Sequence, residues 1–401
     1  MKIMIKRICI VLLIGAALVV GIHCKKPYIP PASSTNSNYL VVEGVVNAGS
    51  DTTSIRLSRT VKLTDTTTVK AEPGAIVTIE SNNHAVYTLS ETGNGVYTIA
   101  ALNIQNSTDK WAVKIVTSDG KVYESDFVPV KNSPPIDNFG YQVKSNGVQL
   151  YSNAHDNTNN TRYYRYDYTE TWIIHPKYGS QMKVVRTPVD TTVVYRDPDD
   201  ERETCWITDI STSISLNSTE KLTQDVVSNN PVVFLASTSE KIEDRYRILL
   251  KQYALTKEAF EYWTNLKKNT EQLGSIFDAL PSEIPGNIHC ITTPSEPVIG
   301  YISVGSVSQM VTYVDTRNLP ISWIPSTPYN DCELDSALFF NPKTKKNDVK
   351  DIIYNGSAFV VGPIYATGNP NPIGYTYSSQ YCSDCTVRGT NKQPSFWIQS
   401  N

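Results

Sequence analysis

Short segments rich in β-branched and aromatic residues recur along the first third of the chain, and they constrain its fold more than any other feature. They lie at residues 39–46, 54–61, 75–80, 85–89, 96–100, 111–117 and 122–128. Clusters of Gly, Asn, Asp and Ser, which favour turns, stand between them. Short strands at nearly regular spacing are typical of β-sandwiches. We therefore predict a β-sandwich of the immunoglobulin or transthyretin type over residues 39–133.

The rest of the chain is also predicted to be mainly β. A Pro-containing break at residues 132–135 ends the first pattern, so residues 136–401 are assigned to a second, larger β-rich domain with long C-terminal loops. Further strand-like segments lie at residues 141–151, 162–174, 183–195, 246–254 and 298–304. One main helix is predicted over residues 256–271, because Thr256 can cap it and apolar residues recur there at helical spacing.

An aromatic stripe marks the strand at residues 162–174. Successive side chains of a strand point to opposite faces, so Tyr164, Tyr166, Tyr168 and Trp172 share one face. A stripe of this kind is usually part of a hydrophobic core. The alternative is a ligand-binding platform on which sugar rings stack, and that function requires the aromatic rings to be exposed.

The N-terminus has the features of an export signal. Basic residues precede a 15-residue apolar run at residues 8–22, and Cys24 follows directly. A cysteine in this place, followed by a polar Pro-bearing stretch, is the layout of a bacterial lipoprotein. We predict a signal peptide at residues 1–23, lipidation of Cys24 and a lipid-anchored tether at residues 24–38. The alternatives are an uncleaved anchor, although spanning a bilayer takes ~20 residues, and ordinary cleavage that leaves Cys24 free.

Five further cysteines are available for pairing in an exported protein. Their odd number leaves at least one unpaired. Cys382 and Cys385 form a CxxC motif, but a zinc site would need a second close pair, and a redox site would need a strand-to-helix junction. We predict a structural disulfide, either within this motif or between it and Cys332. The disulfide candidates are Cys205, Cys332, Cys382 and Cys385.

Charge and motif content indicate which functions are not expected. Lys and Arg number 36 against 39 Asp and Glu, so the chain lacks the basic excess that nucleic-acid binding requires. Nucleotide-binding and hydrolase motifs are absent from the sequence, and its histidines do not stand at metal-ligand spacing. We therefore expect no nucleic-acid partner, metal, cofactor or catalytic residues. A hydrolase with carboxylates from distant segments is the less favoured alternative.

Several segments together resemble one family. The early ones are Cys-Lys-Lys-Pro-Tyr at residues 24–28 and the segments 38–44 and 55–60. The later ones are residues 170–172, 205–206, 258–263, 274–278, 286–288, 298–301 and 382–397. In this order they resemble a Bacteroidetes lipoprotein family of unassigned function, the domain of unknown function numbered four-two-four-nine. The resemblance covers essentially the whole mature chain.

The resemblance implies a cellular location and a protein partner, and it implies no catalytic activity. Members of that family are regarded as outer-membrane lipoproteins and are commonly encoded beside TonB-dependent receptors. It therefore implies a lipid-anchored accessory protein, a partner or substrate-capture subunit of a TonB-dependent transporter, with Cys24 as the one residue carried over. Lys25 and Lys26 stand where surface-exported lipoproteins often have acidic residues, so the membrane face is left open. The alternative is a free-standing carbohydrate- or peptide-binding surface lipoprotein.

The lipidation hypothesis makes a direct prediction. Cys24→Ala is expected to move the protein from the membrane fraction to the soluble fraction, because each buried acyl CH₂ contributes ~0.8 kcal/mol to membrane binding. Fractionation of cells that express the wild type or the variant measures this. Retention of the variant in the membrane would contradict the lipoprotein assignment.

Overall fold

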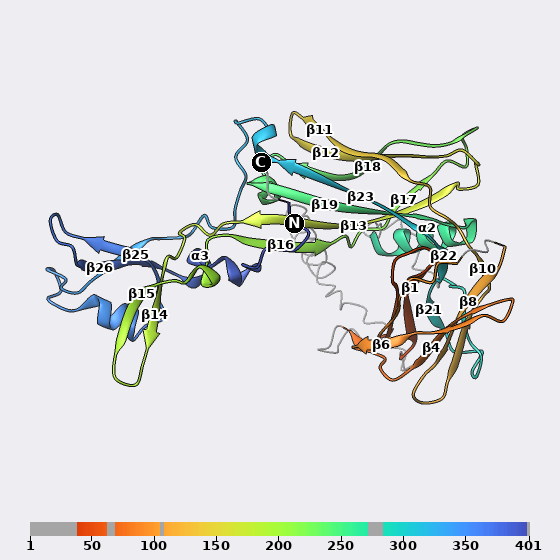
Figure 1. Ribbon diagram of the computed structural model, residues 1–401, viewed down its shortest axis with the longest axis horizontal. Helices are drawn as coiled ribbons and strands as arrows, with labels where there is room; N and C mark the ends of the chain where they lie inside the picture. The colour runs from red at the N-terminus through yellow and green to blue at the C-terminus, as the bar shows by residue number, and fades with distance from the viewer. Residues whose placement is uncertain (1–37, 62–68, 105–107, 272–283, 399–401) are drawn as a thin grey trace, which may run out of the picture.

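The computed structural model describes residues 38–61, 69–104, 108–271 and 284–398. The signal peptide, Cys24 and nearly all of the tether lie outside the described residues. Strands predominate and form three bodies: a first sandwich, a second sandwich and an arm that projects away from both (Figure 1). The prediction of a mainly β fold with one main helix is confirmed.

The first sandwich consists of two sheets. The strands of one sheet are β1 (Leu40–Asn47), β2 (Thr53–Arg59), β3 (Lys70–Ala71), β6 (Ser90–Gly93), β7 (Val96–Ile99), β21 (Val298–Gly300) and β22 (Ser303–Gly305). Those of the other are β4 (Ile76–Ser81), β5 (Val86–Thr88), β8 (Lys110–Val116), β9 (Val122–Ser125), β10 (Val128–Pro129) and β20 (Ile288–Cys290). The main strand orders are β21-β1-β2-β7-β6 and β20-β9-β8-β4-β5. The segments predicted as strands between residues 39 and 128 are all found here.

Three strands of this sandwich come from much later in the chain. β21 and β22 pair in parallel with β1, and β20 pairs antiparallel with β9. They bring Ile288, Ile302 and Val304 into the same core as the early strands. The predicted range 39–133 therefore omits part of this body. The local pattern of residues 288–305 indicates strands but cannot show which sheet they join.

The second sandwich is formed by a three-stranded and a five-stranded sheet. The smaller sheet contains β11 (Ile136–Lys144), β12 (Gly147–Asp156) and β18 (Asp225–Ala236). The larger sheet contains β13 (Tyr163–Ile174), β16 (Cys205–Ile210), β17 (Ser215–Ser218), β19 (Arg245–Ala254) and β23 (Val307–Asp315). The larger sheet has the order β16-β13-β19-β23, and β17 also pairs with β13.

The aromatic stripe lies in the core of the second sandwich. Tyr164 and Tyr166 are 0% exposed, Trp172 is also buried, and Tyr168 packs against the same core from a half-buried position. The structure therefore agrees with the core interpretation. Because the rings are covered by the facing sheet, they cannot serve as a sugar-stacking platform.

Two of the chain segments that join the sandwiches run side by side. The first runs from β10 to β11 and the second from β22 to β23. Lys131 N donates to Val304 O at 2.9 Å, and Ser133 N donates to Ser306 Oγ at 3.0 Å. Gln252 Nε2 of the second sandwich donates to Pro134 O at 2.9 Å. A double connection restricts the relative motion of the sandwiches more than a single linker does.

Helix α2 (Lys257–Glu271) lies close to the predicted 256–271 and sits between the two sandwiches (Figure 1). Thr256 caps it as expected, since its Oγ1 accepts from Ala259 N at 3.2 Å. Ala259 and Tyr262 are its buried residues. The Tyr262 ring lies 5.2 Å from that of Tyr301, which follows β21, so the helix contacts both bodies.

The arm combines a hairpin with a three-stranded sheet. The hairpin is β14 (Met182–Arg186) and β15 (Thr191–Tyr195), and the sheet has the order β24 (Asp335–Leu338), β26 (Pro372–Ser378), β25 (Phe359–Tyr365). A helical turn at Val349–Tyr354 completes a small core with Met182, Ala337 and Tyr375. The arm therefore has its own core, separate from those of the sandwiches.

The return of residues 288–305 to the first sandwich predicts a specific stability effect. Ile302→Ala is expected to cost about 2–5 kcal/mol in the free energy of unfolding, because a fully buried side chain leaves a cavity. Ile299→Ala is the matched control, since Ile299 is exposed and on the adjacent strand. Chemical denaturation of both variants measures the difference. Equal denaturation midpoints of the Ile302→Ala and Ile299→Ala variants would show that Ile302 does not contribute to core packing.

Candidate functional site

A cleft lies where the first sandwich, helix α2 and the larger sheet of the second sandwich meet. It consists of two pockets with volumes of about 370 and 480 Å³. Both pockets are lined by Gly44 of β1 and by Arg165 and Asp167 of β13, so these three residues lie where the pockets adjoin. Clefts between domains are common ligand sites, because two bodies supply walls and polar groups that one alone cannot.

Arg165 is held firmly at the centre of this cleft. The alternation of β13 that directs Tyr164 into the core directs Arg165 outward, where it is only 9% exposed. Its guanidinium carbon lies 4.6 Å from the centre of the Tyr253 ring and 4.4 Å from that of Trp263. Its Nη2 donates to Asp167 Oδ2 at 2.9 Å. The guanidinium is therefore a fixed part of the cleft wall.

Other charged groups of the cleft are less completely paired. Asp51 Oδ2 accepts from Gln309 Nε2 at 2.5 Å. Within the described parts of the chain, the side chains of Glu43 in the first pocket and Lys251 in the second form no ion pair or hydrogen bond. Burial and the Asp167 charge raise the pKa of Tyr253 to about 12, so this hydroxyl stays protonated at neutral pH.

The first pocket has a mostly apolar wall. Its aliphatic lining comes from Val41, Ile210, Ile214, Leu266 and Ile299. Two buried donors in that wall, Arg165 Nε and Trp263 Nε1, have no acceptor among the described residues. The first pocket therefore combines an apolar surface with hydrogen-bonding groups that are only partly satisfied, which suits the binding of a small polar molecule with an apolar part.

The binding residues predicted from the sequence lie on a strand of this site, but their side chains do not line the cleft. The predicted residues are Tyr164, Tyr166, Tyr168 and Trp172 on one face of β13, and the structure buries that face. The cleft uses Arg165 and Asp167 on the opposite face. The available signal was a pair of opposite charges that alternate with tyrosines in the first half of β13.

The second feature with functional potential is the neck that joins the arm to the second sandwich. Cys205 forms a disulfide with Cys385, and Cys332 forms one with Cys382. All four predicted disulfide candidates are thus paired, and the two cysteines of the CxxC motif have different partners. Cys205 begins β16, so the Cys205–Cys385 disulfide ties the arm's C-terminal segment to the second sandwich. Cys290 is a free, buried thiol of the first sandwich.

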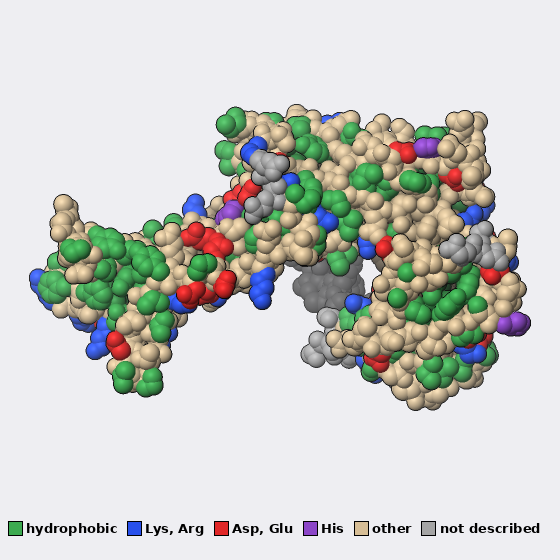
Figure 2. All heavy atoms as spheres, in the orientation of Figure 1, with side chains coloured by type: hydrophobic (Ala, Val, Ile, Leu, Met, Phe, Trp, Pro, Cys, Tyr) green, Lys and Arg blue, Asp and Glu red, His purple; other side chains and the backbone are tan. Residues whose placement is uncertain are grey.

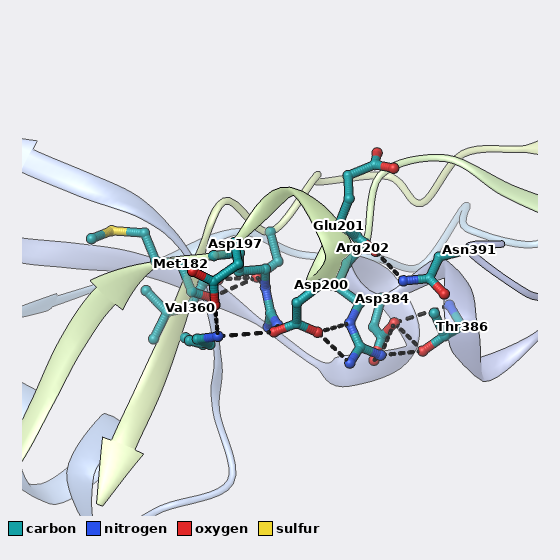
Figure 3. Close-up of polar contacts among 12 residues, drawn as sticks. Met182, Asp197, Asp200, Glu201, Arg202, Val360, Asp384, Thr386 and Asn391 are labelled. Atoms are coloured by element: carbon teal, nitrogen blue, oxygen red, sulfur yellow. Dashed lines mark hydrogen bonds and ion pairs between the residues drawn. The ribbon is translucent and has the colours of Figure 1, made fainter.

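Ion pairs reinforce the same neck (Figure 3). Asp200 accepts from Arg202 at 2.6 Å and from Arg196 at 3.0 Å, and it lies 3.5 Å from Lys183 Nζ. Arg202 also reaches Asp384, which stands between the two cysteines of the motif, at 3.3 Å. Burial alone would raise the pKa of Asp384, but its hydrogen bonds and the Arg202 charge hold this pKa below its usual range. The neck is therefore stabilised by two disulfides and by a network of ion pairs beside them.

The arm carries an exposed apolar surface. Figure 2 shows hydrophobic side chains gathered over the arm. The largest exposed ones on its hairpin and its sheet are Val189, Val194, Tyr195, Phe340 and Tyr365. Apolar patches of this kind on a soluble body commonly mark surfaces of interaction.

The described residues contain neither a membrane-spanning helix nor a metal-binding cluster. None of their helices is both long and apolar enough to cross a lipid bilayer. Their His, Cys, Asp and Glu side chains form no cluster of three or more that could hold a metal ion.

Comparison with known proteins identifies the family of this chain and includes a distant solved structure. The family described as "Domain of unknown function (DUF4249)" matches residues 25–310. No curated protein sequence matches the chain. Among solved structures, the Yersinia pseudotuberculosis adhesin InvE matches 55% of this chain and 57% of its own, with 11% identity and a TM-score of 0.14. A likeness that weak carries no argument about fold or function.

The disulfide pattern predicts which thiols react. Under denaturing conditions without reductant, an alkylating reagent is expected to label Cys290 and to leave Cys205, Cys332, Cys382 and Cys385 unlabelled. Peptide mapping by mass spectrometry measures this, and labelling after reduction is the positive control. Labelling of any of the four before reduction would contradict the pairing.

Proposed function

We propose that this chain, which belongs to the family described as domain of unknown function DUF4249, is a lipid-anchored accessory subunit of an outer-membrane TonB-dependent transporter. It acts as a docking partner or a substrate-capture subunit of that transporter. Family membership alone assigns no activity, so the proposal depends on the sequence of the N-terminus and on the surface of the arm.

The exposed apolar surface of the arm is the observation that carries the proposal. Val189 is 94% exposed at the hairpin turn, and Phe340 is 61% exposed beyond β24. Each large apolar side chain gains about 1.5–3 kcal/mol when it is fully buried. The arm stands apart from both sandwiches (Figure 1). Its exposed apolar side chains are therefore suited to packing against another protein.

The neck supports the same proposal. A flexible arm would lose conformational entropy when it docked, and that loss weakens binding. Two disulfides and the Asp200–Arg202–Asp384 network fix the arm before any partner arrives. Such preorganisation favours tight association without a larger contact area.

The predicted location rests on the N-terminus. The apolar run at residues 8–22 and Cys24 support export and lipidation, and paired cysteines are usual in oxidising compartments outside the cytosol. An acylated Cys24 followed by the tether at residues 24–38 would hold the body near the outer membrane. Whether it faces the periplasm or the cell surface is left open by Lys25 and Lys26.

The alternative is a free-standing carbohydrate- or peptide-binding lipoprotein. Its first basis was exposure of the aromatic stripe, but Tyr164 and Tyr166 are buried. That alternative now depends on the cleft around Arg165, and the cleft is compatible with either function.

The experiment is a mild-detergent pull-down of the tagged full-length lipoprotein from its own cells, with mass spectrometry of the co-purifying proteins. A near-stoichiometric TonB-dependent barrel is expected. An empty pull-down from well-solubilised membranes would contradict the proposal and favour the free-standing binder.

Arm variants test whether the proposed surface makes the contact. The double variant Val189→Asp, Phe340→Asp is expected not to co-purify the TonB-dependent barrel, because two charges would be buried at an apolar interface. Ile76→Asp is the matched control, since Ile76 is 60% exposed on the first sandwich, away from the arm. Equal recovery of the barrel by both variants would show that the arm is not the docking surface.

A further inference from the structure

We propose that the cleft around Arg165 binds a short peptide, with the peptide's amino group at Glu43 and an apolar side chain in the first pocket. The inference concerns the isolated chain and does not depend on the arm or on any transporter partner. It rests on four features of the described residues: an interrupted strand ladder, two unpaired charges, an aliphatic pocket and covered aromatic rings.

The first pocket lies beside an interruption in the strand ladder of β1. β1 pairs with β21 up to Val42 opposite Gly300, and it pairs with β22 from Val45 opposite Ser303. Between these points the ladder on this side of β1 is broken, at Glu43 and Gly44. Both residues line the first pocket together with Tyr301 of the facing segment. We infer that a peptide main chain, which carries donors and acceptors in alternation, bonds to the backbone groups of Glu43 and Gly44 that face this break.

The unpaired charges define two ends of the ligand. The side chains of Glu43 in the first pocket and Lys251 in the second form no ion pair or hydrogen bond among the described residues, although the strand register places Arg56 opposite Glu43 and Asp167 opposite Lys251. Asp167 is bonded instead to Arg165. Glu43 would pair with an ammonium group, and Lys251 would pair with a carboxylate or a peptide carbonyl. With Asp51 included, the cleft has three acidic and two basic side chains. This charge balance does not favour a phosphorylated or otherwise polyanionic ligand.

The walls favour a peptide over a sugar. Aliphatic side chains from both sandwiches and from helix α2 line the first pocket, which suits an aliphatic side chain of the ligand. Sugar binding usually needs exposed aromatic faces. Here Arg165 covers one face of Trp263, and the Tyr262 ring is buried against that of Tyr301.

The test uses isothermal titration calorimetry on the full-length lipoprotein in mild detergent. The probes are Leu-Ala-Ala with free ends, the same peptide with an acetylated amino group, and maltotriose. Leu-Ala-Ala is expected to bind, and acetylation is expected to weaken binding about five- to ten-fold, because it removes the charge that pairs with Glu43. Maltotriose is expected not to bind.

Variants assign the effect to residues. Glu43→Gln is expected to bind both peptides equally weakly, so the discrimination against acetylation disappears. Glu261→Gln, which removes an exposed carboxylate of helix α2 outside the cleft, is expected to keep it. Ile299→Trp is expected to fill the first pocket and abolish binding of both peptides. Ile299 is exposed, and an unchanged unfolding midpoint would confirm that this variant folds.

Several results would overturn the inference. These are no heat from Leu-Ala-Ala, equal affinity for the acetylated peptide, retained discrimination in Glu43→Gln, or binding of maltotriose alone. Because the assay contains a single protein, its failure is separate from an empty pull-down. Peptide binding without a co-purified barrel would support this site and contradict the proposed partner. A co-purified barrel without peptide binding would support the partner and contradict this site.

Discussion

The structure depends on the burial of a late segment in an early core. Residues 288–305 return to the first sandwich, where Ile302 and Val304 pack among its first strands. Without this segment β1 and β9 would be unpaired at one edge, and unpaired edges invite aggregation. The return also gives the two sandwiches a second connection beside the first. The cleft lies between them, so its width is set by packing and not by a flexible linker.

Strand β13 contributes one face to the core of the second sandwich and the other face to the cleft. Alternation along β13 sends Tyr164 and Tyr166 inward and Arg165 and Asp167 outward. The inward rings contribute stability, and the outward ion pair forms the wall between the two pockets. A shift of register by one residue would exchange these roles, which is why core packing and the cleft depend on each other.

The arm is stabilised differently from the sandwiches. Its core is small, and small cores commonly need covalent support. The disulfides Cys205–Cys385 and Cys332–Cys382, together with Asp200 and Arg202, supply that support at the neck. The arm can therefore keep apolar side chains exposed without depending on them for its own folding.

The mainly β fold, most strand positions, the helix with its Thr256 cap and the cysteines that pair could all be predicted along the chain. These features depend on local period, turn residues and residue chemistry, all of which are readable along the chain. The segments 141–151 and 183–195 are predicted as single strands but belong to the hairpins β11–β12 and β14–β15. Asn146-Gly147 and Pro188 at the two turns were the signals for these hairpins. Local patterns do not show that residues 288–305 join the first sandwich, how Cys382 and Cys385 divide their partners, or that Glu43, Arg165 and Lys251 meet in one cleft. Such pairings join residues that are far apart in sequence, and the free energy that selects them comes from packing the whole chain.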